Sequence, residues 1–201
     1  MSGYPEVLES WERDWEPMIE LVGTDMSDGS TQWGADRVEL GSIRRYCEPI
    51  ELSDPIHYDA QSARAAGWED VVAPATAVMM YAIPPMWRPG EPTIFPSAEP
   101  DAQPARTPIN NADPGPAPPT SGFFATDVEI EFLRAVVVGE RLGRRGRKLL
   151  SVTPKQTRVG RGAFMTTESE IVSDRGDVVA RIRTSAYAYN PWSEEEEEEA
   201  R

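Results

Sequence analysis

Four segments near the C-terminal end have strand patterning, and they constrain the fold of this 201-residue chain more than any other feature. In the first, FFATDVEIEFLRAV, apolar and acidic residues alternate, and this period of two is typical of a strand with one buried face. The four predicted strands are residues 123–136, 140–155, 160–174 and 177–190. SDRGD joins the last two, and Gly176 suits the positive φ of a tight hairpin turn. We therefore expect an antiparallel sheet.

The N-terminal part has helical patterning instead. Apolar residues recur at spacings of three and four over residues 5–21, which predicts an amphipathic helix broken near Pro17. Residues 23–37 are rich in Gly, Ser, Thr and Asp and predict a loop. A short helix is predicted over residues 41–50, capped by Ser42.

A further short helix should follow Asp59 as its N-cap and stop at Gly67. The next segment, VVAPATAVMMYAI over residues 71–83, is apolar on every side, which predicts a buried helix starting near Thr76 after Pro74. Helices followed by antiparallel strands indicate an α+β fold. We expect a curved antiparallel sheet wrapped around one long buried helix.

The domain boundaries follow from two segments without such patterning. Residues 84–121 hold most of the 19 prolines and little apolar periodicity, which predicts a long Pro-rich loop. Six consecutive glutamates, residues 194–199, repel one another and predict a disordered acidic tail over residues 193–201. We expect a single domain over residues 1–192.

Composition excludes several classes of protein. The net charge is -14, and without the six glutamates of the tail the rest is near -8, which argues against nucleic-acid binding as the main role. No apolar run approaches the ~18–20 residues of a membrane span, and the acidic N-terminus does not resemble a secretory signal. One cysteine, Cys47, allows neither an internal disulfide nor a cysteine-rich zinc site. We expect a cytoplasmic protein without a metal centre.

The basic residues are distributed unevenly. Residues 141–161 contain eight lysines and arginines and no acid. In an acidic protein such a stripe indicates an anionic ligand or partner, although a solvated strand face would explain it equally well.

His57 is the only histidine of the chain and lies in the stretch IELSDPIHYDA. The unperturbed pKa of histidine, about 6.5, suits general acid and base catalysis near neutral pH. Asp54 is a candidate catalytic partner, but an aspartate directly before Pro55 is also a common turn former or cap.

Three stretches together resemble the MaoC-like hotdog hydratase and dehydratase family, particularly its N-terminal dehydratase domains related to type I fatty acid synthase dehydratases. They are VELGSIRRYCEPIELSDPIHYDAQSARAAGWEDVVAPAT, VEIEFLRAVVVGERL and KQTRVGRGAFMTTESEIVSDRGDVVARIRTSAYAY, and they span roughly residues 36–192. The resemblance implies a hotdog fold, in which residues 76–83 form the central helix and strands over residues 124–190 wrap it.

The catalytic motif of that family is G-D-x-N-P-[LIV]-H, and this chain matches it in part. Residues 55–57 match its last three positions, and Asp54 stands at the asparagine. Leu52 stands at the catalytic aspartate and Glu51 at the glycine. The resemblance therefore implies that the catalytic histidine is present and that its usual carboxylate partner is absent.

The family reaction is the reversible hydration of a trans-2-enoyl thioester to a 3-hydroxyacyl thioester. The resemblance implies that His57 and Asp54 are the catalytic residues, with Glu51 as another possible carboxylate. An N–H at the start of the central helix would polarise the thioester carbonyl, and the basic stripe would bind phosphates. The implied substrate-binding residues are Ala75, Thr76, Arg158 and Arg161.

Two functions of different classes follow. The first is an enoyl-thioester hydratase or 3-hydroxyacyl-thioester dehydratase, as one subunit of a two-subunit enzyme or as a homodimer; the missing aspartate favours a catalytic hotdog partner. The second is a non-catalytic subunit that binds the acyl thioester or serves as a scaffold. A thioesterase would share the fold, but the order of the motifs opposes it. The substrate would be carried on coenzyme A or phosphopantetheine, without any other cofactor, and the long loop suits a bulky acyl group.

Overall fold

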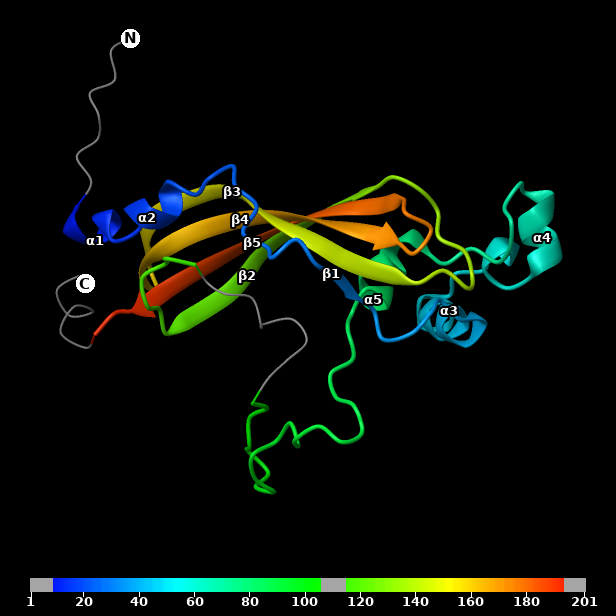
Figure 1. Ribbon diagram of the computed structural model, residues 1–201, viewed down its shortest axis with the longest axis horizontal. Coiled ribbons are helices and arrows are strands. Elements are labelled where there is room, and N and C mark those ends of the chain that lie inside the picture. The colour runs from blue at the N-terminus through cyan, green and yellow to red at the C-terminus, as the bar shows by residue number, and fades with distance from the viewer. Residues whose placement is uncertain (1–8, 106–114, 194–201) are drawn as a thin grey trace, which may run out of the picture.

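Five strands form one curved antiparallel sheet in the computed structural model, which describes residues 9–105 and 115–193. Their order is β1-β3-β4-β5-β2. The strands are β1 (Thr31–Trp33), β2 (Gly122–Phe132), β3 (Leu142–Thr157), β4 (Gly160–Ser173) and β5 (Val178–Pro191). The four predicted strands are confirmed, although the first ends at Phe132 rather than at residue 136. Figure 1 shows the long twisted sheet, with α1 and α2 near one end and α3, α4 and α5 at the other.

The helices are short. They are α1 (Ser10–Arg13), α2 (Glu16–Ile19), α3 (Leu40–Cys47), α4 (Ala60–Ala65) and α5 (Val78–Tyr81), with 3₁₀ turns at Glu48–Ile50, Pro55–His57 and Ala75–Ala77. The helix predicted over residues 5–21 is two helices interrupted at Asp14 and Trp15, and residues 5–8 lie outside the described residues. Pro17 occupies the first turn of α2, where its missing N–H costs no hydrogen bond.

The helix caps agree only in part with those predicted from the sequence. Asp59 caps α4 as predicted, because its Oδ2 atom accepts a hydrogen bond from the Ser62 N–H at 2.6 Å. Gly67 follows that helix with φ +94°, the left-handed conformation expected of a C-terminal stop. The cap predicted at Ser42 is wrong, because α3 starts at Leu40 and Glu39 is its N-cap. Ser42 instead occupies the third helical position and completes a reciprocal capping box with Glu39.

The central helix differs most from the prediction. It comprises one 3₁₀ turn and the four residues of α5, so the expected long helix is wrong. Pro84 disfavours helical geometry at the preceding residue, which ends the segment early. Val78 and Tyr81 are buried, but Met80 and Ile83 are each 41% exposed. The segment is therefore buried on one side rather than on every side.

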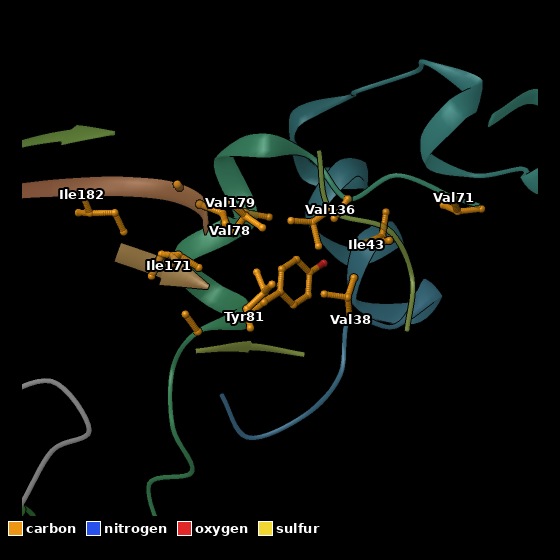
Figure 2. Close-up of a cluster of buried hydrophobic side chains, with 14 of the residues drawn as sticks. Val38, Ile43, Val71, Val78, Tyr81, Val136, Ile171, Val179 and Ile182 are labelled. Atoms are coloured by element: carbon orange, nitrogen blue, oxygen red, sulfur yellow. The ribbon is translucent and has the colours of Figure 1, made fainter. Parts of the chain in front are cut away.

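Two hydrophobic clusters lie on the same face of the sheet, which we call the inner face. The first surrounds α5, where Val78 and Tyr81 pack with Ile171 of β4 and Ile182 of β5 (Figure 2). The second surrounds Trp15 and Met18 near the other end of the sheet. The sheet side chains of the second cluster are Leu149, Ala163 and Ala188. Because alternate residues of a strand share a face, Ile182 and Ala188 of β5 place both clusters on one side.

β1 lies within residues 23–37, where the sequence predicted only loop. It has three residues and pairs antiparallel with β3, with Thr31 opposite Arg145. Gly34, the next residue, makes a close approach: a Cβ atom there would lie 2.0 Å from the Tyr81 carbonyl oxygen. The glycine therefore lets the chain pass directly against α5.

β2 is an edge strand, and its predicted buried face is largely uncovered. Val128 is 49% exposed and Phe132 is 45% exposed on the inner face. Among residues 9–105 and 115–193, no strand pairs with β2 on its outer side, so an unpaired backbone edge and an apolar strip are both accessible. In the part of the chain described here, no helix has the length and apolar character needed to cross a membrane.

Candidate active site

His57 is held in a defined orientation by the backbone. It ends the 3₁₀ turn Pro55–His57, between α3 and α4. Its Nδ1 atom lies 2.7 Å from the Val72 carbonyl oxygen, and the Val72 N–H donates to the Ile56 carbonyl at 3.0 Å. A carbonyl oxygen can only accept, so Nδ1 carries the proton and Nε2 of the neutral ring has a free lone pair. The ring is therefore arranged to act as a base through Nε2.

The predicted carbonyl-polarising groups lie a few residues beyond Val72. Ala75 and Thr76 are the first two residues of the 3₁₀ turn Ala75–Ala77, and both are exposed. N–H groups at these positions have no acceptor within the helix, which leaves them available to a ligand. The segment that fixes His57 thus continues directly into the predicted N–H donors.

A small hollow lies beside these donors, between α5 and the ends of β2 and β5. Its volume is about 10 Å³, which holds one water molecule at most. The residues that line it include Ala75, Val78, Tyr81, Phe132 and Arg134. A thioester does not fit in a hollow of this size within one chain.

The carboxylate position of the hydratase motif is apolar in the structure as well as in the sequence. Leu52 is partly buried and packs against the first hydrophobic cluster. Its carbonyl oxygen accepts a hydrogen bond from the Tyr58 hydroxyl at 2.7 Å. Position 52 therefore carries no carboxylate, and the motif in this chain supplies His57 without its usual aspartate.

Glu51 retains the backbone geometry that explains the family glycine. Its φ is +52° and its ψ is +34°, a left-handed conformation. It is the only non-glycine residue with positive φ among residues 9–105 and 115–193. Its side chain is exposed. The turn before His57 is therefore preserved, although a glutamate occupies it at some cost in strain.

Asp54 has the capping role that the sequence offered as an alternative to catalysis. Its Oδ1 atom accepts a hydrogen bond from the Ile56 N–H at 3.1 Å, which caps the turn containing His57. The side chain is exposed. Asp54 therefore positions His57 through the backbone, and its catalytic role stays a prediction.

Arg158 and Arg161 lie far from His57 in this chain. Arg158 is exposed in the turn between β3 and β4, and the Arg161 guanidinium lies 5.0 Å from the Trp192 ring centre. Between Arg161 and Ile171, which packs near α5, β4 extends over roughly 33 Å at the usual rise per residue. One chain does not bring these arginines to His57, so their role in phosphate binding stays a prediction.

Sequence reasoning missed the burial of a carboxylate that binds Arg134, one of the residues lining the hollow. The Glu140 side chain is inaccessible to solvent and accepts two hydrogen bonds from Arg134, at 3.0 and 2.7 Å. It also accepts from the Ser173 hydroxyl at 2.6 Å and the Val137 N–H at 2.9 Å. Burial alone would raise the pKa of Glu140, but these hydrogen bonds outweigh it and hold the pKa below its usual value. The network fixes the loop that carries Arg134 at the edge of the hollow.

A curated protein is similar to this chain over almost its whole length. The "Probable enoyl-CoA hydratase alpha subunit" of Thermomonospora curvata is 31% identical over 202 residues, covering 99% of this chain and 56% of that protein. This chain thus spans little more than half the length of the curated relative that it matches.

Solved structures share the architecture. One chain of the ChsH1-ChsH2 complex from Mycobacterium tuberculosis is 23% identical with a TM-score of 0.58, over 81% of this chain and 88% of that chain. A MaoC-like dehydratase from Rhodospirillum rubrum is 18% identical with a TM-score of 0.53, over 83% and 95%. At these identities the likeness establishes the hotdog fold alone.

The sequence also matches the model of one protein family. Residues 21–182 match the family described as "FAS1-like, dehydratase domain region". That range includes the His57 turn, α5 and most of the sheet. The chain therefore belongs to the MaoC-like hotdog family, within its FAS1-like dehydratase region.

Proposed function

We propose that this chain is one subunit of a two-subunit hydratase that interconverts trans-2-enoyl thioesters and 3-hydroxyacyl thioesters. The observation that carries the proposal is the hydrogen bond between His57 Nδ1 and the Val72 carbonyl, at 2.7 Å. It fixes a base with a free Nε2 atom against Val72, on the segment that leads to Ala75 and Thr76, two exposed residues at the start of a 3₁₀ turn.

In the hydration direction, Nε2 of His57 accepts a proton from the attacking water while the water oxygen bonds to the β-carbon. The π electrons move towards the thioester carbonyl, whose oxygen gains negative charge and accepts a hydrogen bond from the Ala75 or Thr76 N–H. The histidinium then returns a proton to the α-carbon, which restores the neutral base. Water is the only co-reactant, so atoms and charge balance without a cofactor.

A second hotdog subunit completes this proposal. Leu52 offers no oxygen to orient the water, and the 10 Å³ hollow is too small for a thioester. The hollow includes Phe132, which lies on the open edge strand β2. A subunit docked along β2 would enlarge the hollow into a tunnel and supply the carboxylate. The name of the Thermomonospora curvata relative includes a subunit designation, which supports this arrangement.

The acyl group would be carried on coenzyme A or on phosphopantetheine. Both carriers present the same thioester and pantetheine arm, and the chemistry above uses only the thioester. Arg158 and Arg161 remain candidates for the carrier phosphates in the assembled enzyme, where a partner could bring another active site near that end of the sheet.

A non-catalytic binding subunit is the second candidate, and the packing of Leu52 favours it. In that case the partner would carry out the whole reaction, and His57 would remain only as a structural residue bound to Val72. The two functions differ in whether His57 is needed for turnover.

The deciding experiment is hydration of crotonyl-CoA and of a longer enoyl-CoA by the purified complex of this chain with its copurifying partner. We expect His57→Ala to reduce turnover about 10²- to 10⁴-fold, the usual contribution of a general acid or base. Gln61→Ala, an exposed change on α4, is the control and should leave turnover intact. Unchanged turnover with His57→Ala in a folded complex would establish the binding function instead.

A further inference from the structure

The sheet divides the basic stripe of residues 141–161 between its two faces. On the outer face, opposite the clusters, Arg145 pairs with Glu170 of β4, and their charged atoms lie 2.9 Å apart. Arg144 pairs in register with Ile171, which is buried in the first cluster. Paired residues of antiparallel strands point to the same side, so the Arg144 side chain extends over the inner face.

Arg144 lacks the counter-ion that its neighbour has. It is only partly exposed, and across residues 9–105 and 115–193 no carboxylate or other acceptor pairs with it. Burial, and then the nearby positive charge of Arg147, lower the pKa of Arg144. A desolvated cation next to another cation is unfavourable unless an anion accompanies it.

Ser169 supplies a second unmet donor on the same face. Its hydroxyl oxygen is fully buried and has no hydrogen-bond partner among the residues described. Ser169 lies two positions before Ile171 on β4, so it is the diagonal neighbour of Arg144 across the β3–β4 pair. Diagonal neighbours lie roughly 7–8 Å apart at their Cα atoms, within reach of an arginine side chain. The Arg144 guanidinium and the Ser169 hydroxyl can therefore both donate hydrogen bonds to one ligand group that lies between them.

Polar residues continue from this point across the inner face. The hydroxyls of Thr167 and Thr184 lie 3.2 Å apart on β4 and β5. Together with Arg144 and Ser169 they separate the first hydrophobic cluster from the second. Arg144, Thr167 and Thr184 are partly exposed there, whereas Ser169 is buried, so a ligand on the inner face would meet Arg144 first, with the Ser169 hydroxyl diagonal to it on β4.

We propose that Arg144 and Ser169 form a binding site for a small oxyanion, the carboxylate or phosphate group of a ligand that lies on the inner face of the sheet. A guanidinium donates two parallel hydrogen bonds to such a group, and the serine hydroxyl donates a third. The site stands independently of the hydratase proposal. If the ligand is the acyl thioester, the anion is a carboxylate on the acyl group or a phosphate of the carrier, and this assignment rests on the proposed function.

The test is isothermal titration of the full-length protein with inorganic phosphate and, separately, with glutarate, against sodium chloride at equal ionic strength. We expect saturable binding of one probe, which identifies a phosphate-bearing or a carboxylate-bearing ligand. Arg144→Gln should abolish binding, and Ser169→Ala should weaken it about three- to tenfold. Arg145→Gln, which removes an equal charge from the outer face, should preserve it.

Binding of neither probe, or equal loss in Arg145→Gln, would overturn the proposal and leave the buried hydroxyl to a water molecule. If Arg144→Gln does not fold, Arg144→Lys keeps the charge without the planar fork, and retention of full affinity in that variant would also contradict the site. The titration involves no turnover, so its failure leaves the hydratase proposal intact. Conversely, an inactive enzyme that still binds the anion would leave the site intact.

Discussion

The imidazole of His57 and the carbonyl of Val72 are joined by a 2.7 Å contact that determines the chemistry of the ring. Because the carbonyl accepts, neutral His57 should exist as the Nδ1–H tautomer, and the protonated ring should keep the same bond. Nitrogen-15 NMR of histidine-labelled protein with the imidazole in its neutral form measures this directly. Nε2–H as the main form would contradict the assignment of Nε2 as the base.

A second prediction concerns the strained turn at Glu51. Its left-handed φ of +52° favours glycine. We expect Glu51→Gly to raise the free energy of unfolding by about 0.5–1 kcal/mol, because removal of the Cβ strain exceeds the added entropy of the unfolded chain. Urea denaturation measures the difference. Glu48→Gly is the control, since Glu48 has φ -58° and should lose a similar amount of stability when glycine replaces it.

The third prediction is that Glu140 makes the free energy of unfolding depend on pH in the acid range. Its pKa is held below the ordinary value of 4.5, so its ionised network stabilises the fold above pH 4.5 and is lost as pH falls through the lower folded-state pKa. Glu140→Gln should cost about 3 kcal/mol near neutral pH, because it removes the buried partner of Arg134 and leaves that guanidinium with the exposed Asp177, whose carboxylate lies 3.4 Å away. Denaturation curves between pH 3 and 7 should show, below about pH 4.5, a steeper stability loss for wild type than for the variant. Parallel curves would show that another carboxylate controls the acid transition.

The sheet was largely predictable because pairing leaves an alternating pattern in long strands such as β4. β1 was not, since its three residues are too few to show a period and are stabilised by pairing with β3. The length of the central helix was misjudged because an apolar run does not show where burial stops. Met80 and Ile83, at the end of the apolar run, are exposed although both side chains are apolar.

The candidate site was predictable where a motif defined it and not where distant segments meet. His57 and Leu52 could be assigned from the sequence, and the structure adds the contact to Val72, 15 residues away. Glu140 lies in the stretch VEIEFLRAVVVGERL that carries part of the resemblance, but its burial was not predictable, because a single acid in a loop usually faces solvent. The basic stripe was equally consistent with an anion site and with a solvated strand face, and only the strand register separates the paired Arg145 from the unpaired Arg144.

The last prediction concerns assembly through the edge strand. Val128 is 49% exposed on the inner face of β2, which is the edge strand of the sheet in the part of the chain that the structure describes. Natural proteins place lysine on exposed edges to prevent pairing, so Val128→Lys should weaken association with the second subunit at least tenfold by removing apolar contact and introducing a charge. Asp127→Asn changes the net charge equally on the neighbouring outer-face position and should leave association nearly unchanged. Sedimentation velocity over a range of concentrations measures both variants. Equal weakening would indicate a general charge effect, and intact assembly in Val128→Lys would place the partner on a different surface.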